Sequence, residues 1–342
     1  LKLSNWVLHS QLFEILPHKK FEAYEIKIDV FAMEESVDSA AMALWGMESL
    51  MKIDGMKEKN PYFLFSKALV ATMEQRYYEA LTFLSELQFI IKNGPYHTLR
   101  MMANAEQGGV LIKLKRYKLA LPYLKAAQES GEQLPLPHSI FSQVLSNNLG
   151  IAYMRIDSLE KAAKVFKGML EKSQETGNPI ENSKMHHNLA NTRRQEGKFK
   201  AALMHNDSTI KICLKANIPV GVIFGRLGKT ETLVKMGKAK QAAIELDKAK
   251  ELLLQFPIPD LENEWNRLAA MTYNSLGRHE DAYTYLQEVL ENGQIERENQ
   301  INQLIQAWEV QLKNNQSERR ALDSEIQLAA KQSMVRQLFF IA

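Results

Sequence analysis

The most informative segment of the chain is residues 145–166, LSNNLGIAYMRIDSLEKAAKVF. It contains the small residue Gly150, then Asp157, then Ala162 and the bulky Phe166. Small residues let two helix backbones approach closely, and Asp or Gly can enter the left-handed conformation of a tight turn at low cost. The segment therefore predicts two helices that meet at a sharp turn near Asp157, with the large side chain filling the gap beside the small ones.

The same arrangement recurs along the chain at a nearly fixed interval. Seven alanines, which we call the repeat alanines, follow one another at intervals of 40, 40, 42, 40, 40 and 40 residues: Ala40, Ala80, Ala120, Ala162, Ala202, Ala242 and Ala282. Five residues before them stand the predicted turn residues, Glu35, Gln75, Lys115, Asp157, Gly197, Gly237 and Gly277. A period in this range is typical of a solenoid of stacked helical units, which offers a long binding surface.

The run Leu149-Gly150, Tyr153, Asp157, Ala162 and Phe166 resembles the tetratricopeptide repeat, and Tyr273, Gly277, Ala282 and Leu286 repeat it near the end. The resemblance covers residues 25 to 295, although the standard repeat has about 34 residues. Armadillo and HEAT repeats have periods near 40, but the spacing of small residue, turn, alanine and aromatic matches the tetratricopeptide unit. The resemblance implies an all-α fold, a right-handed superhelical solenoid of seven long helix pairs followed by a long C-terminal helix.

The chain accordingly divides into three parts. Residues 1–20 are expected to form an N-terminal capping helix, residues 21–293 the seven repeats, and residues 294–342 one long helix, since Gly and Pro are absent from Gln294 onward. Apolar residues of this tail fit a seven-residue template, which favours either a coiled coil that makes a homodimer or a helix that folds back on the repeats. The 42-residue interval coincides with a loop at Pro135 and Pro137, where two functional halves would meet.

The tail carries a second resemblance. A long charged helix after the repeats, ending in Leu-Phe-Phe-Ile-Ala, is similar to the sensor regions of bacterial membrane-bound signalling proteins of the diguanylate cyclase or histidine kinase type. That resemblance implies a periplasmic domain of a membrane protein, with a membrane span beyond the C-terminus. The alternative is a cytoplasmic, peptide-responsive regulator similar to the Gram-positive quorum-sensing proteins, which are also built from long tetratricopeptide units.

Composition and motifs favour binding over catalysis. The net charge of +3 is spread over interleaved acidic and basic residues, without the basic stripe that nucleic acids require. The one cysteine excludes an intrachain disulfide and a multi-cysteine metal site. HExxH, P-loop, GxGxxG and GxSxG patterns are all missing from the sequence. We therefore expect a non-catalytic module that needs no cofactor or metal.

The binding residues are predicted from helical spacing. In stacked helix pairs the first helix of each unit lines the concave face, and its outward positions stand 18, 15, 14, 11 and 8 residues before the repeat alanine. Glu231 and Arg267 also fall on this stripe, with Arg226 and Lys229 beside it. The predicted ligand-binding residues are Asn147, Asn148, Lys184, His187, Asn188, Asn191, Arg194, Arg226 and Arg267.

Asn and basic residues on this face resemble those with which some tetratricopeptide domains hold an extended peptide. In such domains Asn side chains clamp the peptide backbone and cations bind its carboxylates. The alternative is that these are ordinary solvated side chains. The leading hypothesis is a sensory or scaffolding module of a signal-transduction protein, which binds a peptide or protein segment and relays its presence through the C-terminal helix.

Overall fold

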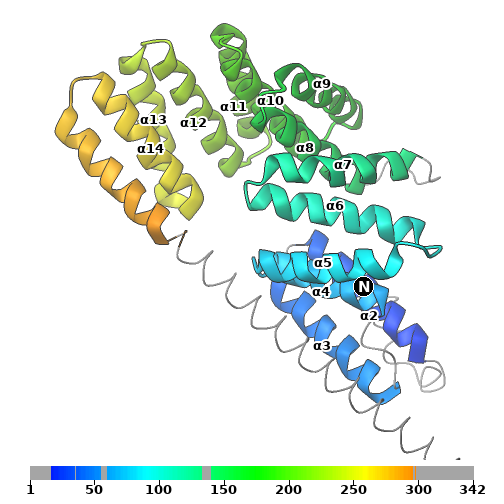
Figure 1. The fold of residues 1–342 in the computed structure, drawn as a ribbon. Helices are drawn as coiled ribbons and strands as arrows, with labels where there is room; N and C mark the ends of the chain where they lie inside the picture. The colour runs from blue at the N-terminus through cyan, green and yellow to red at the C-terminus, as the bar shows by residue number, and fades with distance from the viewer. Residues whose placement is uncertain (1–16, 35, 55–59, 133–139, 296, 298–342) are drawn as a thin grey trace, which may run out of the picture. The chain divides into compact units, whose positions relative to one another are not determined.

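The computed structural model describes residues 17–34, 36–54, 60–132, 140–295 and 297. Every regular element in these ranges is an α-helix, and they contain no strand. The helices follow one another in antiparallel pairs (Figure 1). The predicted all-α fold built from helix pairs is confirmed for the described part of the chain.

The described residues belong to two compact units, which we treat separately. The first contains α2 (Pro17–Met33), α3 (Val37–Asp54), α4 (Pro61–Met73) and α5 (Tyr77–Ile91). Its core includes Phe21, Ile28, Met47 and Phe63, all buried where α2, α3 and α4 pack together. These two helix pairs correspond to the first two predicted repeats.

The second unit, residues 95–297, contains nine labelled helices and a further helical stretch at residues 279–295. The helices are α6 (His97–Lys113), α7 (Tyr117–Glu132), α8 (Ile140–Arg155), α9 (Leu159–Thr176), α10 (Pro179–Gln195), α11 (Phe199–Lys215), α12 (Pro219–Lys235), α13 (Ala239–Gln255) and α14 (Pro259–Ser275). Both sides of the Pro135/Pro137 loop lie within this unit, and α7 packs against α8. The loop therefore does not separate two compact halves.

The turns inside the helix pairs follow the predicted chemistry. All six predicted turn residues that the structure describes adopt a left-handed backbone, with φ of 60° at Gln75, 59° at Lys115, 66° at Asp157, 74° at Gly197, 71° at Gly237 and 79° at Gly277. After α10, for example, the Lys198 amide donates to the Arg193 carbonyl at 2.9 Å and the Gly197 amide to the Arg194 carbonyl at 3.1 Å. These two hydrogen bonds satisfy two of the last carbonyl groups of the helix, and the chain turns sharply after them.

Several first helices begin with proline. Pro61, Pro179, Pro219 and Pro259 open α4, α10, α12 and α14, where the missing amide hydrogen costs nothing because the first turn has no acceptor for it. At α10 the side chain of Asn178 also accepts hydrogen bonds from the amides of Ile180 and Glu181, at 3.0 and 3.3 Å. The proline and the capping asparagine fix the residue at which a helix begins. The start of the helix in turn determines which of its side chains lie on the same face.

Contacts between small and large residues hold each pair together. All seven repeat alanines are buried, and six of them have no exposed surface. A Cβ atom added to Gly150 would stand 2.5 Å from Cε1 of Phe166, and one added to Gly108 would stand 2.5 Å from Cδ2 of Leu124. The small residue of the first helix is therefore in direct contact with the large residue of the second, 16 positions later.

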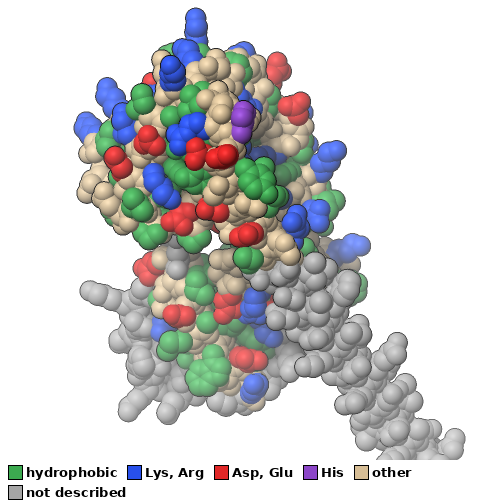
Figure 2. Space-filling model, turned by 90° about the vertical axis from the view of Figure 1, so that its left-hand side faces the viewer, with side chains coloured by type: hydrophobic (Ala, Val, Ile, Leu, Met, Phe, Trp, Pro, Cys, Tyr) green, Lys and Arg blue, Asp and Glu red, His purple; other side chains and the backbone are tan. Residues whose placement is uncertain are grey.

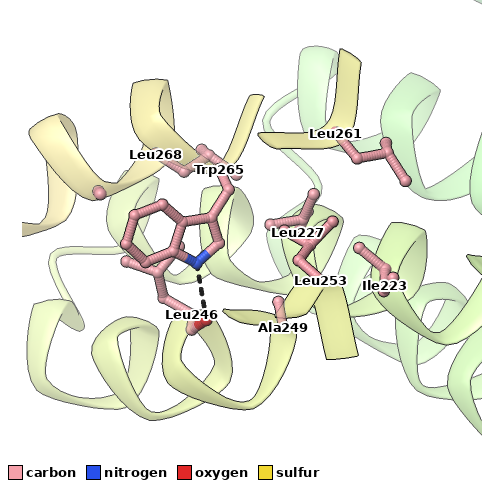
Figure 3. Packing of buried hydrophobic residues seen from close by; sticks show 9 residues of the cluster. Ile223, Leu227, Leu246, Ala249, Leu253, Leu261, Trp265 and Leu268 are labelled. Carbon is pink, nitrogen blue, oxygen red and sulfur yellow. Dashed lines mark hydrogen bonds between the residues drawn. The ribbon is translucent and has the colours of Figure 1, made fainter. Parts of the chain in front are cut away.

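One core of the second unit lies between α12, α13 and α14 (Figure 3). Trp265 of α14 is 3% exposed, and its indole Nε1 donates to the carbonyl oxygen of Leu246 in α13 at 2.9 Å. Leu227, Leu253 and Leu268 surround the same volume. A side chain of one repeat thus penetrates the preceding one, so that successive pairs are held in register.

Two predicted parts of the chain fall largely outside the described residues. The N-terminal capping helix, residues 1–20, is described only from Pro17, which begins α2. The long C-terminal helix, residues 294–342, is described only at its start. The coiled coil, the homodimer and the relay through this helix stay predictions.

Candidate functional site

The candidate site lies on the first helices of four successive pairs in the second unit, α8, α10, α12 and α14. Helix α12 packs against both α10 and α14, so side chains at equivalent positions of successive first helices lie close together. We call the polar face the following set: Asn147, His187, Asn188, Asn191, Arg194, Phe224, Glu231, Glu264 and Arg267. Three groups of contacts connect its members.

The first group is a pair of buried amides. The Asn188 Nδ2 of α10 donates to the Asn147 Oδ1 of α8 at 2.9 Å, and the two residues are 7% and 8% exposed. Burying an amide is costly unless it is hydrogen bonded, so the pair stabilises the approach of the two helices. Both amides are thereby fixed in orientation.

The second group surrounds His187. The Asn191 Nδ2, one turn further along α10, donates to His187 Nε2 at 3.0 Å, and the imidazole meets the ring of Phe224 edge-on with centroids 5.4 Å apart. Burial, together with the charge of Arg194, lowers the pKa of His187 to about 4. The ring is therefore neutral at pH 7, and because Nε2 accepts a hydrogen bond its proton resides on Nδ1.

The third group is a chain of arginines and glutamates. Arg194 Nη2 contacts Glu231 Oε2 at 2.7 Å, and the same carboxylate oxygen lies 3.6 Å from Arg267 Nη2. Arg267 also binds Glu264 through two contacts of 2.8 and 2.7 Å. Burial lowers the pKa of Arg194, whereas the hydrogen bond to Glu264 raises that of Arg267. The guanidinium of Arg194, 9% exposed, is the most buried charge of the group.

The structure brings together six of the nine predicted residues. Asn147 pairs with Asn188 and His187 with Asn191, while Arg194 and Arg267 share Glu231. These contacts place the residues on one face; whether the face binds a ligand stays a proposal.

The other three predicted residues lie elsewhere. Arg226 turns towards α13, where it contacts Glu245 at 2.6 Å, because it stands 16 residues before its repeat alanine and thus off the stripe. Lys184 is exposed, and no contact joins it to the polar face in the described structure. Asn148 lies on the side of α8 next to α6, with Nδ2 3.4 Å from the position of a Cβ added to Gly109.

Three members of the polar face were not among the nine predicted residues: Glu231, which the spacing places on the stripe but which was not among the ligand-binding residues, and Phe224 and Glu264. Phe224 and Glu264 stand 18 residues before Ala242 and Ala282, which is the first of the five outward positions. The spacing could therefore have found them. The prediction relied on amide and basic side chains, and neither an acidic nor an aromatic residue is of these types.

The described surface carries charges of both signs. Acidic and basic side chains are interleaved on the face shown in Figure 2, with no large area of one sign. Within the described ranges, no group of three or more His, Cys, Asp or Glu side chains could hold a metal ion. None of the helices that the structure describes is long and apolar enough to span a membrane.

The buried His187 predicts acid sensitivity. Its pKa falls from the ordinary 6.5 to about 4 on folding, so the unfolded chain binds the proton more readily. Stability is therefore present above pH 6.5 and is lost as the pH falls towards 4, with a loss of about 2 kcal/mol between pH 7 and pH 5. Urea unfolding of the wild type and of His187→Gln at both pH values measures this contribution.

The matched control is His279→Gln, which changes an exposed histidine. It should lose as much stability as the wild type between pH 7 and pH 5, whereas His187→Gln should lose about 2 kcal/mol less. Equal acid sensitivity of the three proteins would contradict the assignment of this contribution to His187.

Comparison with known proteins supports a helical-repeat fold. Residues 265–292 match the tetratricopeptide repeat family, whereas no curated protein sequence matches the chain. The crystal structure of NprR in complex with its cognate peptide NprX is similar over 84% of this chain and 81% of NprR, with 16% identity and a TM-score of 0.65. A Rap protein complexed with competence and sporulation factor matches over 80% of this chain and 76% of that protein, with 14% identity and a TM-score of 0.63.

The apo form of the quorum sensor NprR from B. thuringiensis is similar as well, over 85% of this chain and 91% of that protein, with 13% identity and a TM-score of 0.59. At these identities the likeness shows a shared fold. The predicted resemblance to sensor regions of membrane-bound kinases and cyclases is not shown.

One prediction from the sequence is wrong. The chain was expected to be a periplasmic domain of a membrane protein, on the basis of its charged tail and five final apolar residues. The chain instead shares its fold with the quorum sensor NprR and with Rap, which overturns that placement. The tail that suggested it lies outside the described residues. The chain thus carries a tetratricopeptide repeat at residues 265–292, within an all-α helical-repeat fold that it shares with NprR and Rap.

Proposed function

We propose that this chain is a non-catalytic, peptide-responsive regulator of the quorum-sensing type, which acts in the cytoplasm and holds an extended peptide against the polar face. The observation that carries the proposal is the row of fixed amides and arginines on α8, α10 and α14. Asn side chains offer a donor and an acceptor side by side, which matches the amide and carbonyl of an extended peptide. NprR, whose fold is similar, was crystallised with its cognate peptide.

The arrangement of the polar face suits a long ligand better than a small compact one. Its members lie on helices from four successive pairs, and pairs of this kind stack side by side to make an extended surface. The side chains hold one another in place, as the hydrogen bond between Asn191 and His187 shows. Little conformational entropy is therefore lost when a ligand binds. Such a preorganised surface favours an extended chain.

The test is a selection from a phage-displayed library of random heptapeptides, followed by calorimetric titration of the enriched peptides. Wild-type protein should enrich a defined peptide family. Asn191→Ala should weaken the affinity about tenfold or more, because truncation removes the amide that would bind the peptide backbone. Asn292→Ala, an exposed asparagine on the second helix of the last pair, should bind as the wild type does.

Two outcomes would overturn the proposal. If the wild type enriches no peptide, the polar face is not a peptide site. If Asn191→Ala binds the enriched peptides with wild-type affinity, the peptides bind elsewhere on the molecule. Far-ultraviolet circular dichroism of each variant establishes that the fold is kept.

A further inference from the structure

Two donors on the polar face have no acceptor in the described structure. They are Nη1 of Arg194 and Nδ1 of His187, and both atoms are buried. The other nitrogens of the same side chains are occupied, since Arg194 Nη2 binds Glu231 and His187 Nε2 accepts from Asn191. A buried donor without a partner is unfavourable and rare in folded proteins, which makes these two atoms candidates for contact with a ligand.

The surroundings of Arg194 favour an anion. The charges that act on it belong to Glu231, Glu264, Arg267 and Arg155. Glu264 is already bound twice by Arg267, and Glu231 lies between Arg194 and Arg267. These groups comprise three arginines and two glutamates, so together they carry a net charge of +1. The guanidinium is nine-tenths buried, where a charge-assisted bond to a carboxylate is strongest.

The distance between the two donors also matches the length of a short stretch of extended peptide. Arg194 follows His187 by seven residues, two turns of α10, so both lie on one side of the helix about 10 Å apart along its axis. An extended peptide advances about 3.3 Å per residue, so three residues span this distance. The neutral imidazole suits a neutral acceptor such as a main-chain carbonyl, whereas the charged guanidinium suits a carboxylate.

We infer that the ligand of the polar face is an acidic peptide, which places a carboxylate on Arg194 and a main-chain carbonyl on His187 about three residues away. The inference rests on the proposed function and specifies its ligand. Nη2 of Arg194 already contacts Glu231, so Nη1 is the nitrogen left for the carboxylate of the peptide. The acidic group of the peptide supplies the missing counter-charge, and the carbonyl fixes the direction of the chain.

The heptapeptide selection, repeated with Arg194→Met, tests the inference. The wild type should enrich peptides with Asp or Glu at one fixed position, and Arg194→Met should enrich none with that preference. Lys184→Met is the matched control, because it removes an exposed charge from the same helix. It should keep the acidic preference of the wild type.

A peptide pair sharpens the test. The best wild-type peptide and its analogue with Asn or Gln at the acidic position should differ at least tenfold in Kd with the wild-type protein and hardly at all with Arg194→Met. If Arg194→Met does not fold, the measurement is made with Arg194→Lys, which keeps the charge but loses the forked donor and should reduce the difference.

The outcomes separate this inference from the proposed function. Enriched peptides without an acidic position, or an acidic preference that Arg194→Met retains, would overturn the inference while peptide binding itself stands. Selection of no peptide by the wild type would overturn both.

Discussion

Replacing Trp265 with alanine is expected to lower the free energy of unfolding by about 3–5 kcal/mol. The indole is 3% exposed and lies between α13 and α14, where its removal leaves a cavity lined by Leu246, Leu253 and Leu268. The variant also loses the hydrogen bond from Nε1 to the Leu246 carbonyl. Urea unfolding followed by far-ultraviolet circular dichroism measures the loss.

Trp45→Ala provides the matched control. Trp45 is 72% exposed on α3, so the same substitution should change the free energy of unfolding by no more than about 0.5 kcal/mol. The prediction fails if both variants lose similar amounts, or if Trp265→Ala loses less than about 1 kcal/mol. Unfolding of a repeat array need not follow a single transition, so a separate early transition of the Trp265→Ala protein would agree with the prediction.

Replacing Glu231 with leucine should cost about 3 kcal/mol. The substitution keeps most of the side-chain volume but leaves the buried guanidinium of Arg194 without its nearest anion, and Arg267 loses part of its support. The free energy of unfolding falls because a buried charge is left without a partner. Chemical denaturation at pH 7 gives the loss.

A double-mutant cycle isolates the charge effect. Adding Arg194→Met to Glu231→Leu removes the unpaired charge, so the double variant should be more stable than Glu231→Leu alone. Asp281→Leu is the control, because the Arg278–Asp281 pair is exposed and its loss should cost about 0–1 kcal/mol. A double variant less stable than Glu231→Leu would show that packing rather than charge dominates at this position.

The helix pairs could be predicted from the sequence because they depend on local chemistry. A tight turn needs left-handed backbone, and Asp157 or Gly197 at a fixed distance from a small residue indicates where it falls. The interval between the repeat alanines then extends the pattern to units such as that of Gln75, whose turn residue alone would have given no signal. The turn at Gln75 was predicted only because Gln75 stands five residues before a repeat alanine.

The candidate site could be predicted only in part. Helical spacing indicates which face of α10 carries His187 and Asn191, but not how far a long side chain reaches. Arg226 was predicted beside the stripe, yet its flexible side chain extends to Glu245 on another helix. The burial of Arg194 and its bond to Glu231 depend on how closely α10 and α12 approach, which no pattern along one helix contains.

The contact between Gly150 and Phe166 also constrains how this chain can change over evolution. A side chain added at Gly150 would collide with the aromatic ring, so enlargement at the first position is tolerated only with reduction at the second. The same holds for Gly108 and Leu124. Among homologous sequences, the side-chain volumes at positions 16 residues apart within a repeat should therefore covary. An insertion between the two positions would change their spacing and break the contact.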